Sequence, residues 1–120
     1  MGAWGTEAWD NDAAADWFAD FFEGFSLNAK IKEAFELEDG NDEIRAACFI
    51  LGSLGRVYVW NDDLDELKVL LERGIALLSK MIDAEDENND FLESWDNNPE
   101  VIASVQEQIK ELQARRSEIK

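Results

Sequence analysis

The carboxylates near the start of the chain are the residues whose type and spacing best suit chemistry. Asp12, Asp16 and Asp20 follow one another at intervals of four residues, so a helix would place them on one face. Like charges at this spacing repel by about 0.2–0.5 kcal/mol per pair, unless a cation or a basic partner offsets them. The stripe therefore predicts a binding surface, either for a basic protein or, together with Asp10, for a ligand or metal ion.

The residues before this stripe predict a turn and a helix cap. A glycine lies close to Trp4 on each side, which favours a non-helical turn over residues 1–10, and Asp10 or Asn11 is placed to cap the helix that follows. Trp4 and Trp9 are expected to fold back over the body of the protein. The predicted binding candidates are therefore Trp4, Asp10, Asn11, Asp12, Asp16 and Asp20.

Neither acidic part of the chain has the pattern of a known metal site. Ca²⁺ takes six or more oxygen ligands, and a single helical stripe offers too few. The acidic run from residue 83 resembles a calcium loop at its first positions, but Asn88 stands where that loop requires glycine and Ser94 where it requires glutamate. Residues 83–98 are therefore expected to form a solvated acidic loop with one short helical turn. Its predicted apolar anchors are Phe91, Leu92 and Trp95.

The side chains most used in catalysis are missing from the sequence. There is no histidine, and Cys48 is the single cysteine, so neither a Ser/His nor a Cys/His pair can form. We therefore predict no catalytic residue and no cofactor, and an enzyme is disfavoured. A lone cysteine also excludes an intramolecular disulfide and fits a reducing compartment, which predicts a cytoplasmic location.

The charge of the chain restricts its partners. The 120 residues include 28 acids and 11 bases, a formal net charge of −17. Such a charge repels phosphate backbones and anionic lipids, so nucleic acid and membranes are not expected partners, whereas basic proteins are. The charge is uneven, because residues 1–29 hold six acids and residues 81–109 hold nine, with no base in either segment. A hydrophobic fraction of 46% still predicts a folded protein.

The elements that position these residues are predicted to be helices. Apolar residues recur at intervals of three and four, and alternation with a period of two is nearly absent. Near the start, Trp17 and Phe21 belong to one broad apolar face, whereas residues 43–59 are apolar on nearly every side, as in a buried helix. Within that stretch Gly52 and Gly55 suggest close approach by a neighbour.

The expected architecture is an all-α, compact bundle of about five helices around a buried central helix at residues 43–59. The length predicts a single domain over residues 1–120. Further helix starts are marked by capping residues. These are Ser26 or Asn28, Asp63, and Asn98 before Pro99.

The first seventeen residues resemble the bacterial domain-of-unknown-function 4259 family. The resemblance rests on Gly2-Ala3-Trp4-Gly5, on Trp9-Asp10-Asn11-Asp12 and on Asp16-Trp17, with Glu7 standing where such proteins have glycine. It implies a small bacterial protein of the cytoplasm without an established activity, and it supplies no catalytic residue. It singles out the N-terminal motif as a unit for folding or binding.

Three functional hypotheses follow. The first is a non-enzymatic module that docks a basic protein, in the manner of an immunity protein or inhibitor, because complementary charge speeds association. The second is a carboxylate-based ligand- or metal-binding protein, or an enzyme, that uses Asp10, Asp12 and Asp16. The third is a structural subunit of an oligomer whose interface uses Leu112 and Ile119 of the last helix.

Overall fold

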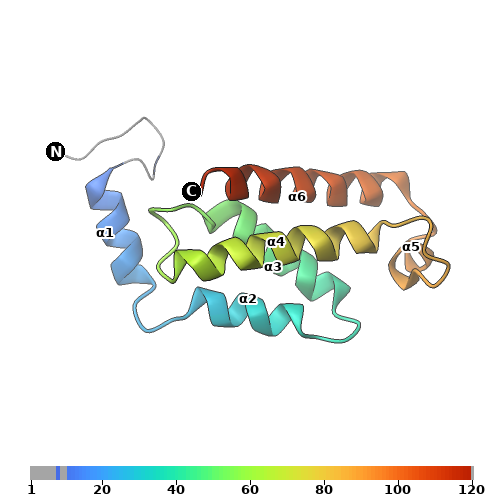
Figure 1. Cartoon of the computed structure of the whole chain (residues 1–120), viewed down its shortest axis with the longest axis horizontal. Coiled ribbons are helices and arrows are strands. Elements are labelled where there is room, and N and C mark those ends of the chain that lie inside the picture. The colour runs from blue at the N-terminus through green and yellow to red at the C-terminus, as the bar shows by residue number, and fades with distance from the viewer. Residues whose placement is uncertain (1–7, 9–10, 120) are drawn as a thin grey trace.

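The computed structural model describes residue 8 and residues 11–119, a part of the chain that forms six α-helices (Figure 1). The helices are α1 (Asp12–Phe21), α2 (Leu27–Phe35), α3 (Asn41–Leu54), α4 (Leu64–Met81), α5 (Asp90–Ser94) and α6 (Pro99–Ser117). The predicted all-α bundle is therefore confirmed. The additional helix is the short α5, which forms inside the predicted acidic loop.

Helices α4 and α6 lie side by side along the length of the bundle (Figure 1). Leu67 and Leu78 of α4 and Val105 and Leu112 of α6 are fully buried. Each such side chain contributes about 1.5–3 kcal/mol relative to an exposed one. An added Cβ at Gly74 would lie 2.9 Å from Cδ1 of Leu112, so the missing side chain allows α4 and α6 to approach closely.

Capping side chains begin the helices where the sequence predicts them. Ser26, Asp63 and Asn98 each accept hydrogen bonds from backbone N–H groups of the first turn of their helix, at 2.8–3.1 Å. These bonds satisfy N–H groups that have no partner within the helix. Pro99 occupies the first turn of α6, where a missing N–H costs nothing.

Helix α3 is shorter than predicted. It ends at Leu54 rather than near residue 59, and Gly55 is its C-cap. A side chain at Gly55 would clash with the carbonyl oxygen of Leu51, so the chain leaves the helix where glycine makes this turn possible. The prediction for Gly52 is confirmed, since an added Cβ there would lie 3.2 Å from the side chain of Glu111 on α6.

The burial of α3 also differs from the prediction. Ile44, Cys48 and Leu51 are buried, but Phe49 is 64% exposed, so the helix is not covered on all sides. Helices α2, α4 and α6 pack against it and leave part of its circumference bare. An apolar composition all round the helix therefore overestimates its burial.

Helix α1 stands at one end of a molecule whose longest dimension is 54 Å, and α5 lies at the other end (Figure 1). The predicted apolar face of α1 exists, but no residue of the helix is buried. Asn61 holds α1 by donating a hydrogen bond of 3.2 Å from Nδ2 to the carbonyl of Ala19. Gly24 begins the turn to α2 with a φ of 79°, a conformation that favours glycine. Among the described residues, no helix combines the length and apolar character needed to cross a membrane.

Candidate functional site

The predicted N-terminal site is only partly within the described residues. Trp4 and Asp10 lie outside them, as do Trp9 and the predicted turn over residues 1–10, apart from residue 8. Asn11 is the N-cap of α1, because its Oδ1 accepts a hydrogen bond of 2.8 Å from the N–H of Ala14. One predicted binding residue thus has a structural role.

The acidic stripe on α1 is exposed to solvent. Asp12, Asp16 and Asp20 are all exposed, and Asp12 lies in the first turn, where the helix dipole favours negative charge. In the described part of the chain no three carboxylates, or carboxylates with Cys, are grouped closely enough to hold a metal ion. The stripe therefore presents charge to the outside without assembling a ligand set among those residues.

The second acidic segment is organised around Asn89. Its Nδ2 donates to the carbonyls of Met81 at 2.9 Å and Asp83 at 3.0 Å, and its Oδ1 accepts from the N–H of Leu92 at 3.0 Å. The side chain of Asp83 accepts a hydrogen bond of 3.0 Å from the N–H of Glu85 within the loop. This segment uses its polar side chains to close its own backbone.

The apolar anchors of this segment are two rather than three. Phe91 and Leu92 are buried in the core, as predicted, but Trp95 is 44% exposed. Trp95 is the C-cap residue of α5, and it is not part of the hydrophobic core. The prediction of Trp95 as an anchor is therefore wrong.

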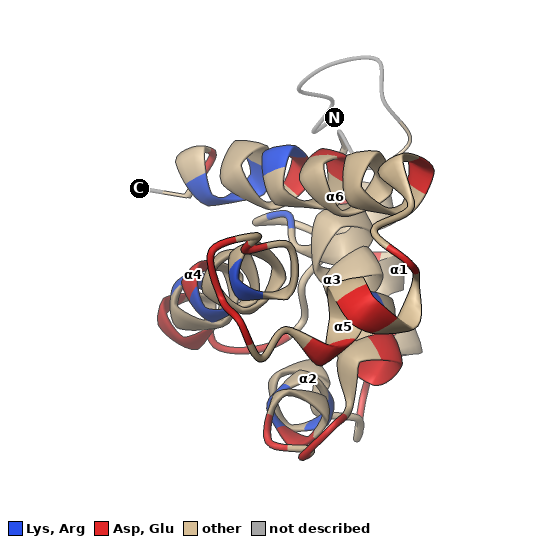
Figure 2. Ribbon diagram, turned by 90° about the vertical axis from the view of Figure 1, so that its right-hand side faces the viewer, with Lys and Arg blue, Asp and Glu red and all other residues tan. Residues whose placement is uncertain are grey.

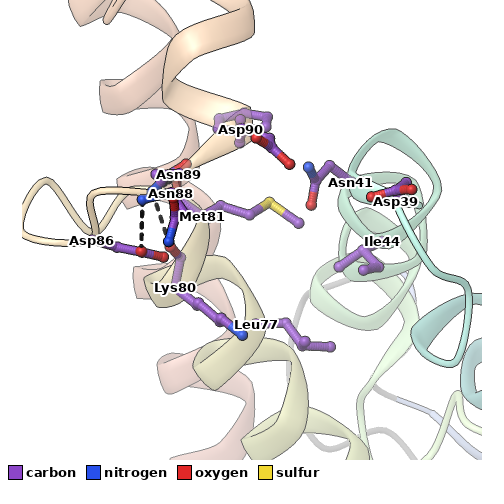
Figure 3. Close-up of a pocket in the computed structure, with 11 residues that line it drawn as sticks. Asp39, Asn41, Ile44, Leu77, Lys80, Met81, Asp86, Asn88, Asn89 and Asp90 are labelled. Atoms are coloured by element: carbon purple, nitrogen blue, oxygen red, sulfur yellow. Dashed lines mark hydrogen bonds between the residues drawn. The ribbon is translucent and has the colours of Figure 1, made fainter.

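The acidic segment around α5 meets the turn between α2 and α3. A pocket of about 240 Å³ separates them, and Asn41 of α3 and Asp90 of α5 point toward one another across it (Figure 3). Asp39 lines it from the turn, and Lys80 of α4 is the one basic residue in its lining. Asp39, Asp86 and Asp90 all line the pocket, so acids are concentrated at this end of the molecule.

The two acidic segments identified in the sequence do not form one surface. The α1 segment and the α5 segment occupy opposite ends of the long axis (Figure 1). Neither α1 nor α5 carries a Lys or Arg, and Figure 2 shows basic residues on α2, α4 and α6. Each end therefore has its own excess of negative charge.

Cys48 is not placed to act as a nucleophile. Its side chain is buried in the core, and this burial raises the pKa of the thiol to about 12, although the charge of Arg45 opposes the shift. The thiolate is the reactive form of cysteine, and at neutral pH this thiol is protonated. Cys48 contributes to the packing of α3.

A strip of aromatic side chains leads from α1 toward α2. We call Trp17, Phe21, Phe22 and Phe25 the aromatic strip. The rings of Trp17 and Phe21 stack with their centroids 4.9 Å apart, and the ring of Phe22 meets that of Phe21 edge-on at 5.1 Å. Trp17 and Phe21 are 58% and 63% exposed. Surface rings of this size contribute little to folding and are typical of binding surfaces.

The aromatic strip continues into an apolar groove between α2 and α3. The groove has a volume of about 470 Å³, and only two charged side chains, Lys30 and Glu43, line it. We call it the α2–α3 groove. Its apolar lining consists of Phe22, Phe25, Leu27, Ile31, Ala34, Ala46, Ala47, Ile50 and Leu54. The strip and the groove share Phe22 and Phe25 and so form one continuous apolar surface.

Asp62 fixes the end of α2 that borders the groove. Its Oδ2 accepts hydrogen bonds from the hydroxyl of Ser26 at 2.7 Å and from the N–H of Asn28 at 3.2 Å. Burial acts to raise the pKa of Asp62, but the bonds from Ser26, Asp63 and Asn28 outweigh it, so the pKa is lowered. The buried amide of Asn28 also accepts from Nε1 of Trp60 at 2.8 Å. The groove therefore has a well-anchored wall.

The sequence does not reveal this groove, because the apolar pattern of α3 indicates a helix that is buried on all sides. The available signal was the small size of Ala46 and Ala47 beside Phe49, a combination that leaves space on one side of a helix. The predicted oligomer interface is also wrong in its residues. Leu112 and Ile119 are buried within the core of the chain itself, where no second subunit can reach them.

No family model, no curated protein and no solved structure matches the chain. The resemblance to the domain-of-unknown-function 4259 family therefore stays a prediction from the N-terminal residues. The protein is an all-α bundle with an exposed apolar groove, and that geometry defines the candidate site.

Proposed function

We propose that this protein is a non-enzymatic binding module whose partner is a basic protein. The observation that carries the proposal is the exposed apolar surface formed by the aromatic strip and the α2–α3 groove. Soluble proteins that act alone rarely expose contiguous apolar surface of this kind, and larger patches mark interaction sites. Aromatic residues are enriched at such sites because they bury much area with few rotatable bonds.

The charge around this surface supports a basic partner. Residues 11–55, which include α1, α2 and α3, contain ten acids against Lys30, Lys32 and Arg45. Arg45 is engaged with α6, where it donates hydrogen bonds to Gln108 at 2.8 Å and Ser104 at 2.9 Å. The field over this part of the molecule is thus negative, and it would steer a positively charged protein to the apolar contact.

The proposal includes the class of partner and the place of action. A net charge of −17 disfavours nucleic acid, for which phosphate contacts dominate affinity. The single thiol fits a reducing compartment, so we propose that the protein acts in the cytoplasm, and the family resemblance suggests a bacterial one. An immunity- or inhibitor-like role would use the same acidic, apolar surface.

The test is affinity capture at low salt from an extract of the source organism, followed by reconstitution with the purified partner. We expect a partner with a basic isoelectric point, and an affinity that falls as salt is raised. Replacing Phe21 by serine removes apolar contact and is expected to weaken the purified complex about tenfold.

The matched control is Val69→Ser, which removes an exposed apolar side chain of α4 outside the aromatic strip and the groove lining. This variant is expected to bind like the wild type. An acidic or neutral partner, or an affinity that both substitutions leave unchanged, would contradict the proposal.

A further inference from the structure

Apolar residues at helical spacing line the α2–α3 groove on both helices. Along α3, the exposed Ala46 and the partly exposed Ile50 and Leu54 follow one another at intervals of four. Along α2, Ala34 is partly exposed, whereas Leu27 and Ile31 line the groove but are buried. Each set lies on one side of its helix, so one apolar ridge of each helix borders the groove. A third helix packs between two such ridges by the same geometry that packs helices within a bundle.

The length of the groove fits one short helix. Alanine at positions 34, 46 and 47 keeps the floor low, so that a partner backbone can approach. The α3 wall extends from Glu43 to Leu54, and at 1.5 Å per residue this corresponds to roughly 16 Å, or about three helical turns. Apolar residues at i, i+3, i+4 and i+7 of the partner would fill it.

Acids lie beside both ends of the groove, and at the α1 end they include Asp20 and Glu23, which flank Phe22 in the sequence. At the end where α2 turns into α3, residues 36–43 contain five acids and no base. We call this segment the acidic turn, and one of its residues, Glu43, lines the groove. The acids around α5 lie across the polar pocket from the same turn (Figure 3). The other end is lined by Phe22 and Phe25.

The acids beside the groove and its apolar lining together indicate which kind of molecule binds there. A second copy of the chain would bring another net charge of −17 to an acidic end, so self-association through the groove is disfavoured. An apolar small molecule would leave the acidic turn unused. A helix with one apolar face and basic residues at one end would contact both the apolar lining and the acidic turn.

We propose that the α2–α3 groove binds a single amphipathic helix of a basic partner, with the Lys and Arg residues of that helix over the acidic turn. The inference rests on the proposed function and specifies the element that the partner contributes.

The probe is a synthetic peptide of about fourteen residues with Leu and Ala at helical spacing and three Lys at its N-terminal end. A scrambled peptide of the same composition lacks the apolar face. We measure the binding of both to the full chain by fluorescence anisotropy. The patterned peptide is expected to bind at least about tenfold more tightly, because only it presents a continuous apolar stripe.

Ala46→Glu tests the location of the site. Ala46 is exposed and lines the groove, so a carboxylate there would be desolvated by the peptide and is expected to weaken binding about tenfold. The matched control is Ala76→Glu, at an exposed alanine on α4 outside the groove lining, which is expected to leave the affinity unchanged.

The double substitution Asp42→Asn and Glu43→Gln tests the charge contact at the acidic turn. It is expected to weaken binding about threefold and to reduce the salt dependence, as the loss of exposed charge pairs does. Glu107→Gln, at an exposed residue of α6, is the control.

The outcomes separate the two proposals. If the captured basic partner binds but Ala46→Glu has no effect on it, the groove assignment is overturned and the proposed function remains. If no basic partner binds at all, both fail. A dimer in light scattering that Ala46→Glu dissociates, or an apolar small molecule that copurifies and is lost in this variant, would also overturn the helix as occupant.

Discussion

The two base-free acidic segments differ in how they use their aromatic residues. Each forms a short helix capped by an asparagine, Asn11 for α1 and Asn89 for α5. Around α5, Phe91 and Leu92 are buried, and Asn89 ties the loop to the end of α4. In α1 no residue is buried, although the helix is longer and richer in aromatic residues. Acidic composition therefore does not decide whether a segment belongs to the core.

The difference assigns separate roles to the two ends. The ends lie apart on a molecule 54 Å long, whereas screening at physiological salt acts within about 8 Å, so their charges act independently. The α5 end is stabilised by its own packing, and Asp90 of α5 lines the same pocket as Asp39 of the α2–α3 turn. The α1 end keeps its aromatic rings exposed. The following experiments test this contrast.

The largest expected effect comes from a matched pair of phenylalanine substitutions. Phe91→Ala removes a ring that is 4% exposed and is expected to lower the free energy of unfolding by about 3–5 kcal/mol. Phe21→Ala removes a ring that is mostly exposed and is expected to cost at most about 1 kcal/mol, mainly from ring stacking. Urea denaturation measures both. Equal losses would show that α1 is part of the cooperative core.

The two capping asparagines give the second test. Asn89→Ala removes a cap and the hydrogen bonds to the carbonyls of Met81 and Asp83, and is expected to destabilise the whole protein by about 1–2 kcal/mol. Asn11→Ala removes only the cap of α1. We expect faster hydrogen exchange within α1 and little change in global unfolding. A global loss as large as that of Asn89→Ala would contradict the contrast.

The third test uses pH at Asp62, which anchors α2 next to the α1 end. The pKa of Asp62 is lowered by folding, so its stabilisation is complete above the unfolded value of about 3.9 and is lost as pH falls through the folded value. Asp62→Asn is expected to cost about 1 kcal/mol at neutral pH. The difference in Tm between wild type and variant should shrink below about pH 4. Glu87→Gln, at an exposed loop residue, serves as the control.

The smallest effect is expected from relief of repulsion within α1. Asp20→Asn removes one like-charge neighbour of Asp16 and is expected to stabilise α1 by about 0.2–0.5 kcal/mol, seen as slower amide exchange in that helix alone. Magnesium or calcium at millimolar concentration should not reproduce this protection. If either ion does so in the wild type and fails to do so in the variant, the metal-binding alternative gains support over the contrast drawn here.

Local features of the fold were predictable from the sequence, because they depend on neighbouring residues. The caps at Ser26, Asp63 and Asn98 follow from short polar side chains that satisfy backbone N–H groups within three residues. The close approach at Gly52 follows from the lack of a side chain. The sequence also fixes the charge and the absence of histidine, which limit the possible chemistry.

The candidate site was predicted less well, because periodicity shows which face of a helix is apolar but not whether another element covers it. The apolar faces of α1 and α3 look like core faces in the sequence, yet α1 has no buried residue and α3 exposes Phe49. Trp95 is an equivalent case beside α5. The tertiary structure alone decided these points, because burial depends on where the other helices lie and on how much surface they are able to cover.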